Sequence, residues 1–133
     1  MMNYGIGKAV DLSYDEAIDA VTEELKKQGF GILTTIDVKD TLKKKIDKDF
    51  ERYVILGACN PNFAYRALGA VPNLGLLLPC NVIVHETPQG QTIVEIFNPL
   101  FMAEIIDHPD IKEIARSVAG SLQTVLDALP AQA

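Results

Sequence analysis

Two short motifs pair a cysteine with an asparagine, and together they contain both cysteines of the chain. Cys59 is followed by Asn60 and Pro61 in "LGACNP", and Cys80 is followed by Asn81 in "LLPCNV". A cysteine thiolate is a nucleophile and a ligand for soft metals, and an asparagine amide both donates and accepts hydrogen bonds. These residue types suggest a thiol site assembled from two segments that are distant along the chain.

Cys59 lies just before a predicted helix. Asn60 is a favoured N-cap, and Pro61 is favoured at the first helical position. The helix dipole and the unpaired amides at such a terminus stabilise an anion, so a lowered thiol pKa is physically plausible for Cys59. The alternative, which the local sequence favours by itself, is a buried free cysteine that serves as a small core residue.

Cys80 and Asn81 fall at the start of an apolar run that is typical of a strand. Alternation along a strand places Cys80 on one face with Val82 and Val84, and Asn81 on the other face with Ile83. An apolar face indicates that Cys80 belongs to the core, whereas the preceding proline indicates an edge or a bulge. A buried Asn81 would need a partner, and we expect a structural hydrogen bond rather than a ligand.

Lys45 borders the apolar stripe of a predicted short helix at 38–47. Either its stem covers apolar surface while the amine stays in water, or its charge faces a pocket that holds a thiolate or an anionic ligand. The two histidines, His85 and His108, are not spaced as metal ligands with either cysteine. A zinc site formed by His85 and both cysteines would require all three to converge.

Composition excludes several other classes of function. The chain has 133 residues, a formal net charge of −6 and a pI of about 4.8. An acidic surface repels phosphate, so we expect neither nucleic acid nor an anionic membrane as a partner. The sequence contains no nucleophile elbow, phosphate loop or dinucleotide fingerprint. It lacks a signal-peptide pattern, so we expect a soluble cytoplasmic protein with free thiols.

The elements that must position these residues follow from hydrophobic periodicity and turn chemistry. Strands are predicted at 4–10, 30–36, 52–58, 74–86 and 91–97, and helices at 14–28, 38–47, 61–69 and 110–129. The last two strands are joined by "TPQG", so at least one pair is antiparallel. We therefore expect one α+β domain over residues 1–133, with a mostly antiparallel sheet and two long helices packed on one face.

The segments "KKKIDKDFERYVILGACNPNFAYRAL" and "LLLPCNVIV" resemble the domain of unknown function 302 family, as do "YGIGKAV" and "IFNPLFM". The resemblance covers roughly residues 3 to 129. It implies a β-α-β(4)-α fold of the TATA-binding-protein-like class, with the short helices as insertions, and a homodimer. It also implies that five residues form one cluster, namely Lys45, Cys59, Asn60, Cys80 and Asn81.

These observations lead to one main hypothesis and two alternatives. The main hypothesis is a small ligand-binding or thiol-site protein in which Cys59 is an activated thiolate, Lys45 its counter-charge, and the asparagines fix the surrounding backbone. Its ligand would be a small electrophile, a sulfur species or a soft metal. The alternatives are a structural dimer without chemistry, in which the Cys-Asn pairs lock strand ends, and a zinc-binding module.

Overall fold

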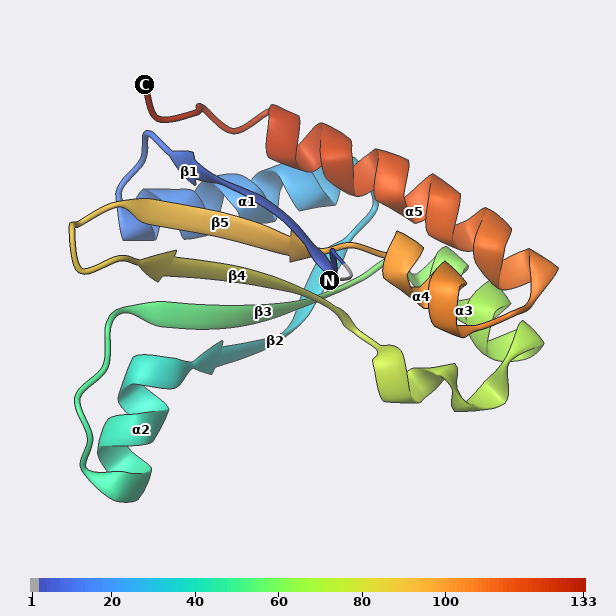
Figure 1. Ribbon diagram of the computed structural model, residues 1–133, viewed down its shortest axis with the longest axis horizontal. Helices are drawn as coiled ribbons and strands as arrows, with labels where there is room; N and C mark the ends of the chain where they lie inside the picture. Colours follow the sequence, from blue (N-terminus) through green and yellow to red (C-terminus); the bar gives the residue numbers. More distant parts are fainter. Residues whose placement is uncertain (1–2) are drawn as a thin grey trace.

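A computed structural model describes residues 3–133 and contains one five-stranded sheet with helices of very different lengths (Figure 1). The strands are β1 (Gly5–Val10), β2 (Gly31–Asp37), β3 (Tyr53–Cys59), β4 (Cys80–Glu86) and β5 (Thr92–Phe97). The helices are α1 (Tyr14–Lys27), α2 (Val38–Ile46), α3 (Pro61–Ala70), the 3-10 helix η1 (Pro72–Leu77), α4 (Leu100–Ile105) and α5 (Pro109–Asp127).

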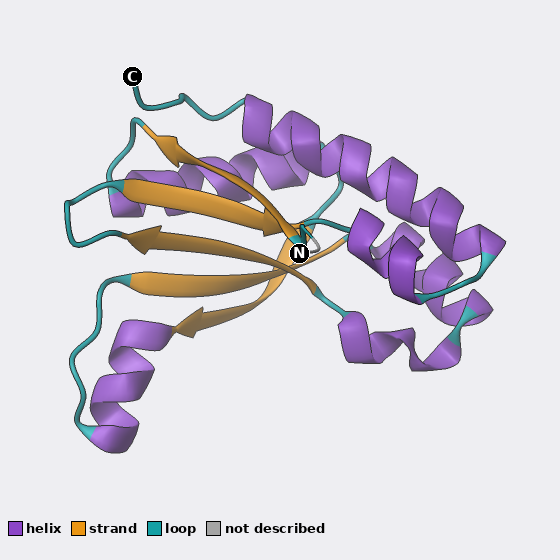
Figure 2. Cartoon of the chain, in the orientation of Figure 1, coloured by secondary structure: helices purple, strands orange, loops and turns teal. Residues whose placement is uncertain are grey.

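The sheet is antiparallel throughout, with the strand order β1-β5-β4-β3-β2. The long helices α1 and α5 cover one of its faces, so the predicted α+β architecture is confirmed (Figure 2). Val54, Val84 and Val94 point toward these helices and are almost completely buried. Their strand neighbours point to the opposite face, which no helix covers to the same extent.

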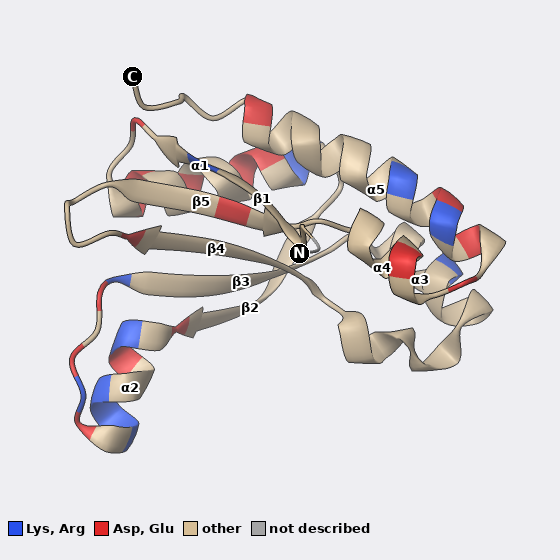
Figure 3. Cartoon of the chain, viewed as in Figure 1, with Lys and Arg blue, Asp and Glu red and all other residues tan. Residues whose placement is uncertain are grey.

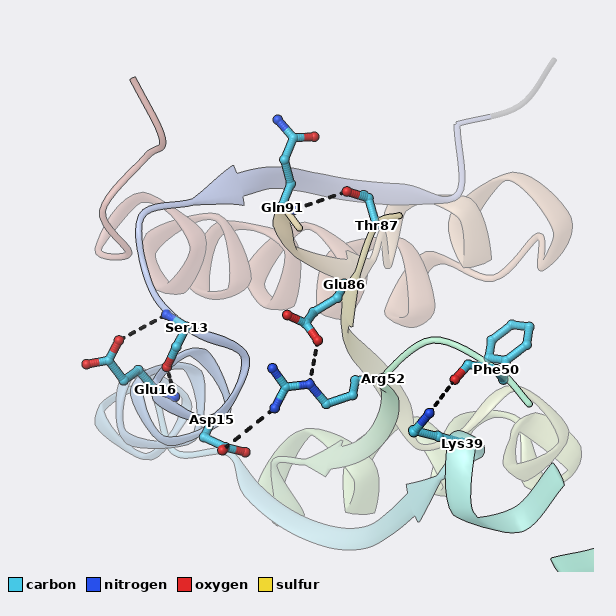
Figure 4. Close-up of polar contacts among 9 residues, drawn as sticks. All are labelled: Ser13, Asp15, Glu16, Lys39, Phe50, Arg52, Glu86, Thr87 and Gln91. Atoms are coloured by element: carbon cyan, nitrogen blue, oxygen red, sulfur yellow. Dashed lines mark hydrogen bonds and ion pairs between the residues drawn. The ribbon is translucent and has the colours of Figure 1, made fainter. Parts of the chain in front are cut away.

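Helix α1 forms where the sequence predicts it, because its ends are satisfied locally and one side is apolar. Ser13 accepts a hydrogen bond from the Glu16 amide, and the Glu16 carboxylate accepts one from the Ser13 amide (Figure 4). This capping box satisfies two amides that would otherwise lack partners. At the other end Gly29 adopts φ +83°, the left-handed conformation expected of a residue that ends a helix.

Arg52, directly before β3, ties the start of α1 to the sheet. Its guanidinium pairs with Glu86 of β4 and lies 3.9 Å from the Asp15 carboxylate (Figure 4). It also sits 4.8 Å above the Tyr14 ring. These contacts fix the end of the molecule that is remote from the cysteine motifs.

Two segments differ from the sequence-based prediction. Residues 74–79 were expected to begin a long strand, but the chain forms η1 through Leu77, and β4 begins only at Cys80 after a cis Leu78–Pro79 peptide. Periodicity does not distinguish a short apolar run in a strand from one in a helix. Helix α4 was not predicted, because its six residues are fewer than two turns.

Helix α2 and its flanking segments extend from the far end of β2 and β3 as an arm (Figure 1). Nothing in α2 is buried, and Leu33, Ile36, Ile46 and Phe50 are between 45% and 68% exposed. Lysines cluster on this arm, in contrast to the acidic remainder of the chain (Figure 3). Over residues 3–133 no helix is sufficiently long and apolar to cross a bilayer.

Candidate functional site

Both cysteines line one small apolar cavity. It lies where β3 ends and β4 begins, beneath α3 and α5, and its volume is about 50 Å³. The two Cys-Asn motifs meet there because Ala58, next to Cys59, is paired with Cys80 across the antiparallel strands. The rest of the lining is mainly aliphatic and aromatic, with Phe30, Phe63, Leu74, Met102, Ile111 and Val118 among its residues.

Cys59 is half-buried at the end of β3, immediately before the helix cap. The Asn60 side-chain oxygen accepts hydrogen bonds from the amides of Asn62 (3.1 Å) and Phe63 (3.3 Å), and Pro61 occupies the first helical position. The sequence-based expectation for this helix start is therefore confirmed. The Asn60 side-chain nitrogen also lies 3.5 Å from the Gln28 carbonyl, so the amide links α3 to the turn after α1.

Cys80 is the more enclosed of the two thiols and is only 7% exposed. Burial, with a smaller contribution from neighbouring Cys59, raises the pKa of the Cys80 thiol from 9.0 to about 11. Low polarity disfavours the charged form of a thiol, so Cys80 stays protonated at neutral pH. The expectation that Cys80 belongs to the core side of its strand agrees with this burial.

Asn81 does not share the cavity. It is exposed on the sheet face opposite Cys80, as alternation along β4 requires. A role in fixing the backbone around the thiols, and a buried hydrogen bond, are therefore both wrong for Asn81 in this chain. The physical reason is that adjacent residues of a strand point to opposite sides.

Lys45 is also remote from the cavity. Strand pairing places the α2 end of the sheet at Asp37 and Val54, and the cysteine end at Gly31 and Cys59. The length of β3, about 20 Å at roughly 3.3 Å per residue, separates these ends. Figure 1 shows α2 and α3 at opposite ends of the sheet. Lys45 is thus not the counter-charge of Cys59 within one chain.

The residues proposed for a zinc site do not converge either. His85 is at the far end of β4 from Cys80 and on the other face, stacked on Tyr53. Across residues 3–133, no three His, Cys, Asp or Glu side chains gather as a metal site would require. The side-chain heteroatoms that the cavity offers come from the two cysteine thiols, the Met102 thioether and the Asn60 amide.

A second hollow, which was not predicted from the sequence, lies on the open face of the sheet. It measures about 510 Å³, and Tyr53, Asn81, His85, Glu95 and Phe97 are among its lining residues. The sequence feature that could have predicted it is the alternation of side chains along β4 and β5. This alternation places polar and aromatic side chains on the face opposite the buried valines.

Comparison with known proteins gives a family and a fold. Residues 6–129 match the family described as "Domain of unknown function DUF302". The chain is also similar to a solved structure described as "uncharacterized conserved protein DUF302 from Bacillus stearothermophilus". The sequence identity is 30%, the TM-score is 0.87, and the match covers 95% of this chain and 98% of the other. No curated protein matches the chain.

Proposed function

The chain belongs to the DUF302 family, and we propose that it binds a small, uncharged, thiol-reactive molecule in the cavity that its two cysteines line. The observation that carries the proposal is the meeting of two motifs, centred on residues 21 positions apart, at one cavity. A core cysteine can be placed by packing alone. Two cysteines that line the same cavity, one of them half-exposed, provide a binding site with a thiol that can react with the ligand.

The size and polarity of the cavity define the class of ligand. A dry cavity of about 150 Å³ accommodates benzene, so about 50 Å³ has room for only a few non-hydrogen atoms. An apolar lining provides no compensation for a buried charge. The expected ligand is therefore a small neutral electrophile, such as a short α,β-unsaturated carbonyl compound, and not a nucleotide or a large cofactor.

The two thiols have different roles in this proposal. Cys59 is the nucleophile, because it is half-exposed and lies beside the N-terminal amides of α3. Its sulfur bonds to the β-carbon of the unsaturated ligand, and the proton from the thiol ends on the α-carbon. Cys80 remains a protonated, polarisable part of the wall. A soft metal would require deprotonated thiols, which the burial of Cys80 opposes.

Size-selective labelling tests the proposal. We would measure adduct formation by mass spectrometry with acrolein, a very small α,β-unsaturated carbonyl compound, and with bulky N-phenylmaleimide, for native protein and for urea-unfolded protein. The rate with the small reagent divided by the rate with the bulky reagent should be about tenfold higher for the native protein than for the unfolded protein. This factor corresponds to a steric penalty of about 1.4 kcal/mol. The rate with the small reagent should also saturate, because binding precedes reaction.

Single variants assign the reaction to one sulfur. Cys59→Ser should abolish the native adduct, and Cys80→Ser should retain it. The proposal would be contradicted if the ratio of the rates with the small and the bulky reagent were the same in folded and unfolded protein. It would also be contradicted if Cys80 reacted faster than Cys59. If the purified protein retained one soft metal ion per chain through both thiols, the cavity would be a metal site and not a site for an electrophile.

A second candidate function, a structural homodimer, is favoured by the arm formed by residues 33–50. Four of its large apolar side chains are exposed, namely Leu33, Ile36, Ile46 and Phe50. Residues 33–50 contain five lysines and four aspartates, a net charge of +1, which leaves −7 on the rest of a chain whose total is −6. A second copy offers an acidic surface to this basic arm, and oppositely charged surfaces favour association.

The dimer is tested by light scattering coupled to gel filtration. We expect the wild-type protein to have twice the chain mass, and Ile46→Glu, at the exposed end of α2, to shift it toward the monomer. Leu76→Glu is the matched control, because Leu76 is also highly exposed but lies on η1. A monomeric wild-type protein would exclude this function.

A further inference from the structure

The open face of the sheet carries a groove whose chemistry differs from that of the cysteine cavity. Its volume is about 510 Å³, ten times that of the cavity, and its walls come from β1, β3, β4 and β5. Tyr53, His85 and Glu95 occupy the strand positions that alternate with buried Val54, Val84 and Val94. The groove and the cavity can therefore be occupied independently.

Glu95 is the acidic residue of this groove, and the neighbouring strand is shaped around it. Gly5 and Gly7 of β1 lie beside Glu95, and a Cβ atom at either position would collide with the glutamate side chain. The two glycines thus leave space for a half-buried carboxylate. No group of residues 3–133 forms an ion pair or a side-chain hydrogen bond with it, and its oxygens remain accessible.

Aromatic side chains line the same groove as this carboxylate. Tyr53 stacks on His85 with 5.1 Å between ring centroids, and Tyr4 and Phe97 complete the aromatic lining. Tyr4, Tyr53 and Glu95 line the same groove. Burial raises the pKa of the Tyr53 hydroxyl, and the negative charge of Glu95 adds to this effect. The groove combines aromatic faces with one negative charge.

We propose that this groove binds an organic ammonium cation, with the aromatic rings contacting the cationic head and Glu95 neutralising its charge. The electron-rich face of an aromatic ring attracts a cation, and quaternary ammonium groups are recognised by such cages. The carboxylate repels anions, and the net charge of −6 raises the local concentration of cations. The ligand class differs from that of the cysteine cavity, so this proposal stands independently of the proposed function.

A matched pair of probes tests the charge requirement. Choline and 3,3-dimethylbutan-1-ol have nearly the same shape, but only choline carries a positive charge. We would titrate each into ¹⁵N-labelled full-length protein and follow the amide resonances of the groove. We expect millimolar, saturable binding of choline at residues around Glu95 and Tyr53, and binding of the neutral alcohol that is about tenfold weaker.

Two variants and one control link binding to the named residues. Glu95→Gln keeps the size of the side chain and should weaken choline binding about tenfold, and Tyr53→Leu should weaken it by a similar factor. Glu104→Gln, at an exposed position of α4, should leave affinity unchanged. Circular dichroism establishes that each variant is folded.

Three results would overturn the proposal. Equal affinity for choline and the alcohol would mean that the groove is only a hydrophobic surface. An unchanged affinity in Glu95→Gln would exclude the carboxylate as a contact. The third result is that choline leaves the groove resonances unshifted. If light scattering then shows a dimer, this face is covered by another chain; if it shows a monomer, the groove has no affinity for cations.

Discussion

Alkaline pH should destabilise the protein through one buried thiol, Cys80. In the unfolded chain this thiol ionises near its ordinary pKa of 9.0, whereas burial raises the pKa in the folded protein to about 11. Between these values the unfolded state loses a proton that the native state retains. The native state then binds more protons, so the free energy of unfolding falls as pH rises through this window.

The magnitude follows from the size of the pKa shift. A difference of about two pKa units corresponds to about 2–3 kcal/mol, since each unit is worth 1.36 kcal/mol. This stabilisation is fully present below pH 9 and is lost progressively up to pH 11. It is a large fraction of the 5–15 kcal/mol that is typical of a folded domain.

Urea unfolding at a series of pH values measures the effect. Wild type and Cys80→Ala would be compared from pH 7 to 11 in the presence of a reductant. The two proteins share every other titrating group, including Cys59 and the tyrosines, so their difference isolates the Cys80 thiol. The free energy of wild type minus that of the variant should be flat up to pH 9 and then fall by about 2–3 kcal/mol. A difference that stays constant to pH 11 would refute the burial of this thiol.

Further predictions concern positions where one contact dominates, and urea unfolding measures each of them. Leu122→Ala should cost about 2–5 kcal/mol because Leu122 is fully buried in α5, whereas Leu76→Ala, at an 85% exposed site, should cost less than about 0.5 kcal/mol. Asn60→Ala should cost about 1–2 kcal/mol by removing the cap of α3, and Asn60→Asp should restore most of that loss; equal costs would contradict capping. Gly29→Ala should cost about 1–2 kcal/mol because of its φ of +83°, whereas Gly31→Ala, where a Cβ meets nothing within 4 Å, should be nearly neutral.

Local sequence signals were sufficient wherever neighbouring residues decide the structure. Ser13 and Glu16 specify the start of α1, Gly29 its end, and Asn60 with Pro61 the start of α3. Each signal acts through hydrogen bonds or backbone angles within a few residues, so distant parts of the chain are not needed to interpret it. η1 begins at Pro72, and proline is favoured at a first helical position, but the apolar run that follows fits a strand equally well, so a strand was predicted there instead.

The candidate site could be predicted only in part. Alternation correctly separated Cys80 from Asn81, but the sequence alone did not say that Asn81 would face an open groove. Lys45 was grouped with the cysteines through a family resemblance, yet the pairing of β2 with β3 places it at the other end of the sheet. Proximity between distant segments depends on strand register, which local patterns do not encode.

The sequence by itself determined the α+β class, the two long amphipathic helices and the caps that bound them, because periodicity and capping are short-range properties of the chain. Only the tertiary structure decided that Cys59 and Cys80 share a cavity and that Glu95 lies over Gly5 and Gly7 within an aromatic groove. Those arrangements arise from the order and register of five antiparallel strands, which bring together residues that are far apart along the chain.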